Sequence, residues 1–103
     1  MYSRATLLEI DTLRIDLASA VGLYREQVLP AMREQDGYEG VLVLTNPDGK
    51  AMIVSFWETE AEAWDASGFA AAELERYTTI FRAPPGREQY EVAIAELPDL
   101  QPV

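Results

Sequence analysis

The chain has 103 residues, and its eight Lys and Arg against eighteen Asp and Glu give a formal net charge of −10 with no histidine. A chain of this length forms one domain, and with 49% hydrophobic residues it can bury a core without disulfides. Its negative charge argues against nucleic acid or an anionic membrane surface as a partner, because an acidic protein neutralises no phosphate. The lack of cysteine and histidine excludes thiolate nucleophiles, zinc–thiolate sites, histidine-dependent triads and histidine metal ligands.

Targeting and phosphate-binding signals are also missing from this sequence. There is no basic start followed by an apolar run of signal-peptide length, and no apolar stretch approaches about 18 residues. Gly49-Lys50 lacks the earlier glycine that a phosphate-binding loop needs. We therefore expect a cytoplasmic protein that neither spans a membrane nor cradles a nucleotide.

The first third of the chain predicts a strand followed by a helix. Residues 2–11 alternate imperfectly between apolar and polar side chains and contain no Pro or Gly, which indicates a β-strand. From about residue 16 to 35 the apolar side chains take helical spacing, with Asp16 as the expected N-cap. Pro30 removes one backbone hydrogen bond, so we expect a bend near Gln27 or a helix that restarts at Pro30.

The middle of the chain predicts a β-hairpin. Residues 38–45 and 50–57 are rich in strand-forming side chains and are joined by Asn46-Pro47-Asp48-Gly49. Proline presets φ at the second position of a type I turn, and Gly49 is free to adopt a positive φ, which together favour a bulged hairpin. We interpret Asn46 as a turn-forming residue rather than a catalytic amide.

The last third predicts a second helix and a final strand. Thr59-Glu60-Ala61-Glu62 is a capping-box sequence that starts the helix. We expect a break in that helix at Gly68, and a final strand over residues 87–96. The domain is expected to cover residues 1–97, with a tail at 98–103. The predicted apolar side of the helix runs through Ala63 or Trp64, Ser67, Ala71, Leu74, Thr78 and Phe81.

The resulting order, βαββαβ, predicts a ferredoxin-like α+β fold, in which a four-stranded antiparallel sheet carries both helices on one face. Residues 41–44 and 51–57 are apolar at nearly every position, so we expect both sheet faces to be covered. The simplest cover for the second face is the sheet of another copy, so we predict a homodimer through the sheet face. A tail folded back over the sheet is the alternative, but the seven residues 97–103 are too few to cover it.

Two segments carry a resemblance to a known family: VLPAMREQDGYEG at 28–40, and FWETEAEAW at 56–64 after the hairpin. With them the chain resembles the antibiotic biosynthesis monooxygenase family of dimeric α/β-barrel proteins, over nearly its whole length. Relatives with this pattern include cofactor-free oxygenases, quinol oxygenases and haem-degrading enzymes.

Residue by residue, the resemblance favours some of these activities over others. Trp57 matches the aromatic residue that closes the third strand and lines the ligand pocket in family enzymes. Haem degraders also need a histidine on the second helix, where this chain reads GFAAAE at 68–73, and an asparagine on the first strand, where it offers Thr6 or Glu9. Quinol oxygenases commonly carry a histidine in the same helix. The resemblance therefore implies no cofactor and a monooxygenase acting on an aromatic polyketide-like or quinol substrate.

In such an enzyme the deprotonated substrate reduces O₂ directly, while the protein supplies a dry pocket, a base and a group that stabilises the oxyanion. Without histidine the base is a carboxylate of raised pKa, a tyrosinate or water, and no catalytic residue is singled out by spacing. For Tyr24 and Trp64, packing in the core is the simpler interpretation. The candidate substrate-binding residues are Trp57, Tyr24, Tyr77 and Trp64, with Arg4 and Arg87 as further candidates by residue type.

Three further interpretations concern metals and non-enzymatic roles. Glu58, Glu60 and Glu62 suit a hard cation by type, but acidic residues favour the first turn of any helix, so we expect no metal site. A non-catalytic protein that binds a small aromatic ligand, or an accessory protein, on the same dimeric fold is the main alternative, and a purely structural or assembly role is the third. An open pocket of roughly 300 Å³ or more between helices and sheet would favour the monooxygenase and the ligand-binding protein over the structural role.

Overall fold

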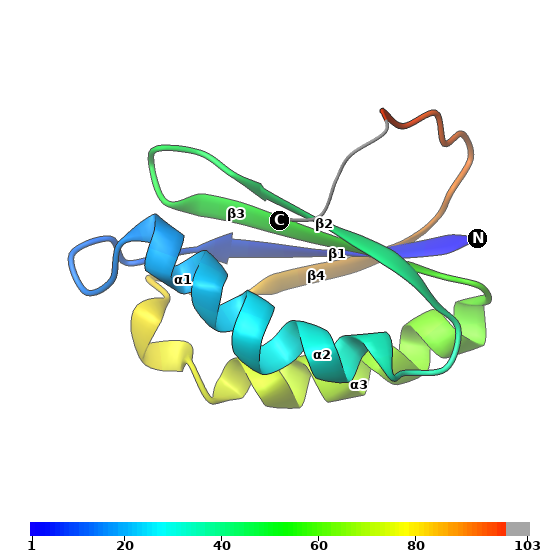
Figure 1. Cartoon of the computed structure of the whole chain (residues 1–103), viewed down its shortest axis with the longest axis horizontal. Coiled ribbons are helices and arrows are strands. Elements are labelled where there is room, and N and C mark those ends of the chain that lie inside the picture. The colour runs from blue at the N-terminus through cyan, green and yellow to red at the C-terminus, as the bar shows by residue number, and fades with distance from the viewer. Residues whose placement is uncertain (99–103) are drawn as a thin grey trace.

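The computed structural model describes residues 1–98 and contains one four-stranded antiparallel sheet (Figure 1). Its strands, β1 (Tyr2–Glu9), β2 (Tyr38–Thr45), β3 (Lys50–Trp57) and β4 (Gly86–Glu91), lie in the order β2-β3-β1-β4. This confirms the ferredoxin-like α+β fold. The last strand ends earlier than the sequence predicts, because its partner β1 begins at Tyr2, which pairs with Glu91.

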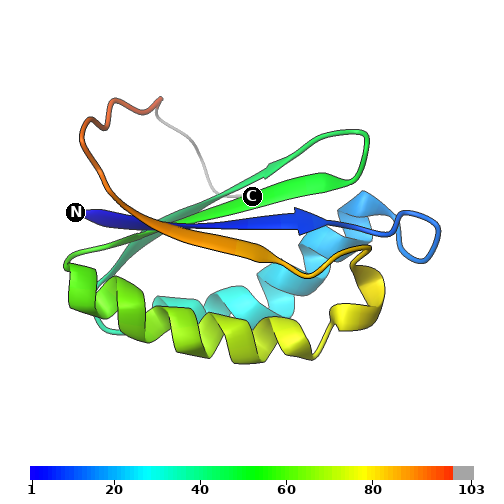
Figure 2. The same ribbon diagram turned by 180° about the vertical axis from the view of Figure 1, so that it is seen from behind.

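One layer of two helical segments covers one face of the sheet, and the other face carries no helix (Figures 1 and 2). The first helical segment is continuous, but it changes from α1 (Leu17–Leu23) to a π-helical turn, η1 (Tyr24–Val28), and back to α2 (Leu29–Arg33). The N–H of Leu29 donates to the carbonyl of Tyr24 five residues earlier, directly before Pro30, which has no N–H. This confirms the irregularity expected near Gln27.

The second helical segment is α3 (Glu60–Glu75), followed by a short 3₁₀ turn, η2 (Thr78–Ile80). The break expected at Gly68 is wrong: the helix runs unbroken, because the adjacent turns are held by Ala66 and Ala70, which are buried against the sheet side. The predicted apolar side is right at Ala63 and Leu74 but wrong between them, where Ala66 and Ala70 are the buried residues, and Trp64 is 70% exposed.

The predicted turn and caps are present. Asn46 Oδ1 accepts hydrogen bonds from the N–H groups of Asp48 and Lys50, so this side chain forms the turn, and Gly49 has φ +86°. A Cβ at Gly49 would lie 2.8 Å from the carbonyl oxygen of Ile10. Asp16 accepts from the Ser19 N–H at 2.8 Å, and Thr59 Oγ1 accepts from the Glu62 N–H at 3.2 Å.

The face without helices is apolar, as the sequence predicts. The strand registers place alternate residues of β1, β2 and β3 on it, and Leu7 and Leu44 are about half exposed there, at 52% and 51%. Residues 92–98, after β4, rise on this side without packing down, since Ile94 is 88% exposed (Figure 2). The predicted tail lies outside the described residues from 99 onward. The apolar residues of this open face are Ala5, Leu7, Leu42, Leu44, Met52, Val54 and Phe56.

Candidate functional site

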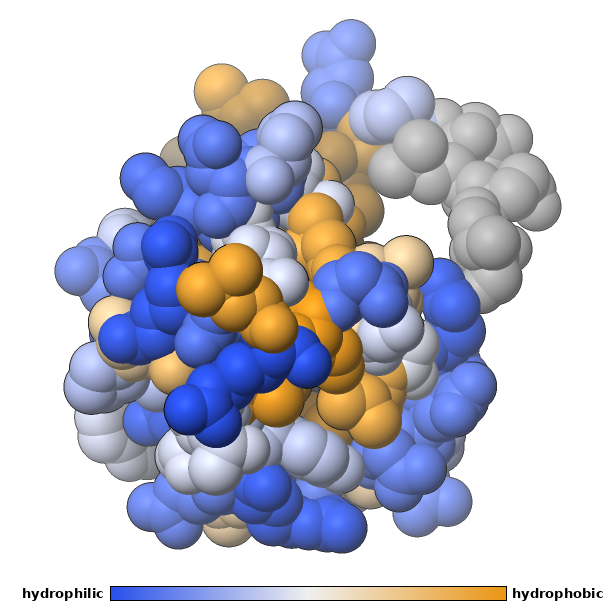
Figure 3. Space-filling model, turned by 90° about the vertical axis from the view of Figure 1, so that its left-hand side faces the viewer, coloured by the Kyte–Doolittle hydropathy of each residue, from blue (hydrophilic) through white to orange (hydrophobic). Residues whose placement is uncertain are grey.

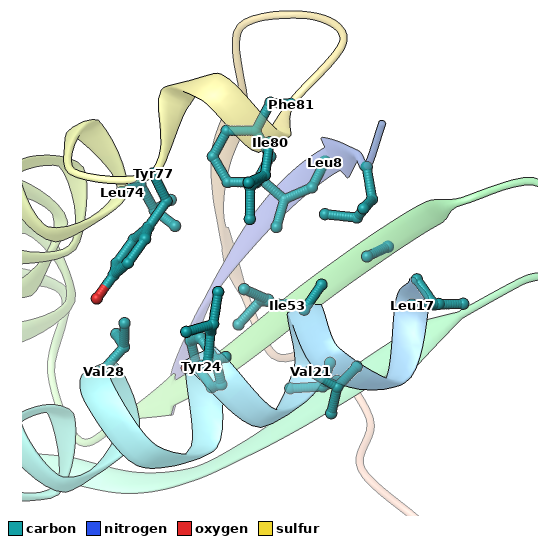
Figure 4. A pocket seen from close by; sticks show the side chains of 15 residues that line it. Leu8, Leu17, Val21, Tyr24, Val28, Ile53, Leu74, Tyr77, Ile80 and Phe81 are labelled. Carbon is teal, nitrogen blue, oxygen red and sulfur yellow. The ribbon is translucent and has the colours of Figure 1, made fainter. Parts of the chain in front are cut away.

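An apolar cavity lies between the helical segment formed by α1 and η1 and the sheet. It faces the end of the molecule near the loop between β1 and α1 (Figure 3). It encloses about 50 Å³, or about 530 Å³ when the space out to its open mouth is included. At this end the surface shows apolar side chains gathered between hydrophilic ones (Figure 3). The walls include Leu17 and Val21 of α1, Leu8 and Ile53 of the sheet, and Ile80 and Phe81 after α3 (Figure 4).

Tyr24 and Tyr77 are the two lining residues with a titratable side chain. Tyr24 comes from the π-helical turn and Tyr77 from the segment between α3 and η2, so the two rings approach the cavity from different helical segments (Figure 4). π-helical turns occur often at functional sites, because the extra residue re-aims the side chains around it. The cavity thus has an apolar body with two phenols at its walls.

A smaller polar pocket adjoins the cavity; we call it the Arg4 pocket, and it is lined by Arg4, Thr6, Ser55 and Tyr24 together with apolar neighbours. Tyr24, Val28, Ile53 and Leu74 line both spaces. The pocket encloses about 10 Å³, which is room for about one water molecule. Polar groups therefore lie at the inner end of an apolar cleft, which is a common arrangement in ligand sites.

Arg4 is the unusual group of this pocket. It is 4% exposed, and neither its Nε nor its Nη2 has a hydrogen-bond partner. Burial, together with the positive charge of Arg87, lowers the pKa of the Arg4 guanidinium to about 10. At neutral pH the Arg4 side chain therefore remains charged, and no carboxylate is among the groups that shift its pKa. Burying a charge without a partner is costly, so such groups need an explanation.

Tyr24 also carries an unpaired polar atom. Its hydroxyl oxygen is buried and has no hydrogen-bond partner. Burial raises the pKa of Tyr24 to about 12, and Tyr38 raises it further while the nearby Arg4 charge opposes the shift. At neutral pH the phenol is protonated, so it offers a hydrogen-bond donor and is a poor general base.

Trp57 lies in the core rather than on a cavity wall. It is 0% exposed and packs in a cluster with Val28, Met32 and the alanines of α3. Its indole N–H donates to Ser55 Oγ at 2.9 Å, and its ring meets Tyr38 edge to face at 5.7 Å. The polar atom of the indole is thereby used within the core.

Three of the four aromatic candidates are brought near one another, and the fourth is not. Tyr24 and Tyr77 line the cavity and pack against the core cluster that contains Trp57, whereas Trp64 lies on the solvent side of α3. Arg87 is exposed on β4, one strand away from Arg4 and close enough to lower its pKa. Among residues 1–98, no group of three Asp or Glu residues is placed to hold a metal ion, and no helix is long and apolar enough to cross a bilayer.

Sequence reasoning assigned no pocket role to Thr6 or Ser55 and named Arg4 only by residue type. A signal was present in the alternation of β1, because Arg4 shares its side of the strand with Thr6 and Leu8, both of which are buried. That parity places a charged side chain on the face that the helices cover. The position of Tyr24 in the lining of the Arg4 pocket depends on how the helix packs on the sheet, and the sequence carries no comparable signal for it.

No protein-family model matches the chain. Two Mycobacterium tuberculosis proteins of uncharacterised function are similar to it in sequence: Rv2558 is 31% identical over 96 residues, and Rv2557 is 32% identical over 95. These matches cover 91% and 90% of this chain but 39% and 41% of the relatives. The chain thus spans about two fifths of the length of these relatives.

Solved structures are similar in fold at low sequence identity. A monooxygenase from the ActVA-Orf6 gene of Streptomyces coelicolor, in complex with nanaomycin D, superposes with a TM-score of 0.71 at 18% identity, covering 95% of this chain and 92% of that one. A Deinococcus radiodurans protein assigned to the antibiotic biosynthesis monooxygenases gives 0.72 at 15% identity, covering 94% and 97%. MhuD with manganese protoporphyrin IX bound gives 0.63 at 13% identity, covering 95% and 100%. The chain therefore has the ferredoxin-like fold of the antibiotic biosynthesis monooxygenases.

Proposed function

We propose that the chain is a homodimeric, cofactor-independent monooxygenase that acts on an aromatic polyketide-like or quinol substrate. The observation that carries the proposal is the apolar cleft with Tyr24 and Tyr77 in its walls and an unpaired guanidinium at its inner end. A solved monooxygenase with this fold has the ligand nanaomycin D bound. The enclosed space of about 50 Å³ is smaller than a ring system, so the proposal requires the cavity to widen when substrate enters.

The reaction needs little from the protein. The substrate loses a proton to give an enolate or phenolate, which transfers electrons to O₂. At an anthrone-type CH₂ group, one oxygen atom becomes the new carbonyl oxygen, and the other leaves as water with the two hydrogens. The apolar walls exclude bulk water, and the donors at the inner end stabilise the negative charge on the substrate oxygen.

The experiment is oxygen uptake with a panel of dihydroxynaphthalenes and anthrones. We expect consumption of one O₂ for each carbonyl formed, and ¹⁸O from ¹⁸O₂ in the product. Tyr24→Phe is expected to slow turnover, whereas Trp64→Phe, on the solvent side of α3, serves as the matched control. Trp57→Phe with unchanged turnover would count against the role that the resemblance gives Trp57. No uptake with any panel member would remove the support for oxygenase activity.

A non-catalytic ligand-binding role is the second candidate, and one observation favours it. No carboxylate lines the cavity within residues 1–98, and the raised pKa of Tyr24 makes that phenol a poor base. In this case an aromatic ligand binds in the cleft and leaves unchanged. Binding without oxygen uptake across the whole panel would favour this candidate over the enzyme.

The proposed dimer uses the open face of the sheet. Leu7 and Leu44 are half exposed there, beside Met52, Val54 and Phe56, and no helix of the described chain covers them. Native mass spectrometry measures the subunit number together with any retained ligand. We expect a mass near twice 11.5 kDa, whereas a monomer at all concentrations would overturn the dimer.

A further inference from the structure

Arg4 stands out because the fold gives it no partner. Its guanidinium is 4% exposed, and two of its nitrogens, Nε and Nη2, make no hydrogen bond. Burial and the charge of Arg87 lower the pKa of Arg4, only Tyr24 raises it, and no carboxylate contributes. A native fold that buries a positive charge in this way either pays a large penalty or completes the site with an anion.

The groups around Arg4 are donors. The Tyr24 hydroxyl is buried, unpaired and protonated at neutral pH, and Thr6 is 2% exposed on the same strand two residues away. Ser55, across from Arg4 in the register of β1 and β3, already accepts the indole N–H of Trp57. A guanidinium and a phenol that converge on one small space form the complement of an oxyanion.

The apolar cavity lies directly beside these donors. Tyr24, Val28, Ile53 and Leu74 line both the Arg4 pocket and the larger cavity, so a ligand that reaches Arg4 has its remaining atoms among apolar side chains (Figure 4). The protein as a whole carries a net charge of −10, so anions are not attracted to its surface in general. Selectivity for an anion must therefore arise inside the cleft.

We propose that Arg4 and Tyr24 form an anion-binding site at the inner end of the cavity, which takes the oxyanion of a planar aromatic acid while its rings occupy the apolar part. This deepens the proposed function and rests on the aromatic ligand named there. Arg4 supplies the charge, and the Tyr24 hydroxyl supplies a second hydrogen bond. The site distinguishes ligands by their charge rather than by their ring shape.

The structure also offers one internal alternative. Gln89 lies opposite Arg4 in the register of β1 and β4, and its Oε1 is buried without a hydrogen-bond partner, while its Nε2 donates to the Glu60 carbonyl at 3.2 Å. A pair between Gln89 Oε1 and Arg4 would satisfy both groups without a ligand. The test therefore has to separate a ligand-binding Arg4 from a structural one.

The first measurement is the thermal unfolding midpoint of the full chain with 2-naphthoate, and with the neutral 2-naphthamide as an isosteric probe. We expect 2-naphthoate to raise the midpoint and to bind at least tenfold more tightly than 2-naphthamide in calorimetry. Arg4→Met is expected to abolish this preference, and Arg4→Lys to keep part of it. Arg33→Met removes the same charge from an exposed position on α2 and is expected to leave the preference unchanged.

The midpoints of the unliganded variants give the second readout. Arg4→Met is expected to unfold at a higher temperature than the natural chain, because a flexible apolar side chain replaces an unpaired buried charge. A lower midpoint, together with an unchanged preference for naphthoate, would assign Arg4 to a structural pair with Gln89. Tyr24→Phe leaves the charge in place and is expected to weaken naphthoate binding by a smaller factor than Arg4→Met.

Each outcome separates this inference from the proposed function. Equal binding of 2-naphthoate and 2-naphthamide, or equal stabilisation by chloride alone, would overturn the aromatic-acid site. Oxygen uptake that persists unchanged in Arg4→Met would leave the monooxygenase standing without it. Tight, Arg4-dependent binding without oxygen uptake would support the site and count against the enzyme. Failure of both aromatic probes to bind would overturn the aromatic-acid site, while the oxygen-uptake panel decides the enzyme independently.

Discussion

The space between the helices and the sheet has two halves that are built differently. In one half, Trp57 fills the gap, and Ala63, Ala66 and Ala70 bring α3 close to it, which leaves only the small Arg4 pocket at its border. In the other half, Leu8, Ile10, Ile53 and Leu74 form a smaller cluster around the apolar cavity. A large ring against small helix residues packs tightly, whereas branched side chains facing a π-helical turn leave room. The space for the rings of a ligand therefore lies in the loosely packed half.

The largest expected effect is in the packed half. Trp57→Ala should lower the free energy of unfolding by about 3–5 kcal/mol, because it opens a cavity in a fully buried cluster and leaves Ser55 without its indole donor. Trp64→Ala is the matched control and should change it by no more than about 0.5 kcal/mol, because Trp64 is exposed. Urea unfolding followed by circular dichroism measures both. Similar losses in the two variants would contradict the assignment of Trp57 to the core.

Enlarging an alanine in each half tests the difference in packing directly. Ala66→Leu should destabilise the chain by about 1–3 kcal/mol, because the added carbons have no space between α3 and the sheet. Ala20→Leu places the same atoms at a cavity wall and should cost less than about 1 kcal/mol while blocking aromatic ligands. Unfolding curves measure the stability cost in the two variants, and titrations with aromatic ligands measure whether Ala20→Leu blocks binding. A larger cost at Ala20 would show that the cavity is not available space.

Alkaline pH tests the boundary between the two halves, where Tyr24 lies. The pKa of Tyr24 is raised from 10.0 to about 12 by burial, so its favourable contribution is complete below pH 10.0 and is lost as the pH rises toward 12. Arg4, with its lowered pKa, contributes in the opposite direction over the same range, because the unfolded chain binds the extra proton. These two buried groups therefore offset each other in the natural chain.

Tyr24→Phe removes one side of this balance. Between about pH 9 and 11.5 the variant should lose less stability than the natural chain, by up to about 2 kcal/mol. The measurement is the unfolding midpoint of both proteins at several pH values, with Tyr77→Phe, which also removes a hydroxyl from a cavity wall, as the control for a general alkaline effect. Identical pH dependence in Tyr24→Phe and the natural chain would show that the Tyr24 hydroxyl reaches solvent.

The smallest effect is expected at the start of α1, which borders the cavity. Hydrogen bonds from the Ser19 N–H and hydroxyl lower the pKa of Asp16, so its contribution is present above its usual value of 3.8 and is lost as the pH falls below it. Asp16→Asn keeps a capping side chain but does not titrate. Amide hydrogen exchange in α1 should therefore accelerate at acid pH in the natural chain and less in the variant. Equal acceleration in both would assign the effect to other carboxylates.

Much of the fold could be predicted from the sequence because the relevant signals are local. The hairpin turn, the two N-caps and the irregularity before Pro30 each depend on a few adjacent residues, and the structure contains them all. The unbroken α3 was not predicted, because tertiary packing of Ala66 and Ala70 outweighs the weak helix propensity of Gly68. For the site, the residue types and the side of the strand on which each residue lies can be read from the sequence. The meeting of Arg4 and Tyr24 in one pocket cannot.

By itself, the sequence determined the order of the elements, the single-domain size, the acidic charge and the absence of histidine and cysteine chemistry. These depend on composition and on neighbours along the chain. Only the tertiary structure decided that Trp57 packs in the core, that Trp64 faces solvent, and that Arg4 and Tyr24 meet at the end of one cavity. Twenty positions separate Arg4 from Tyr24 in the numbering, and their meeting depends on how the π-helical turn sits over β1. Sequence periodicity describes each face separately but not the distance between two faces after packing.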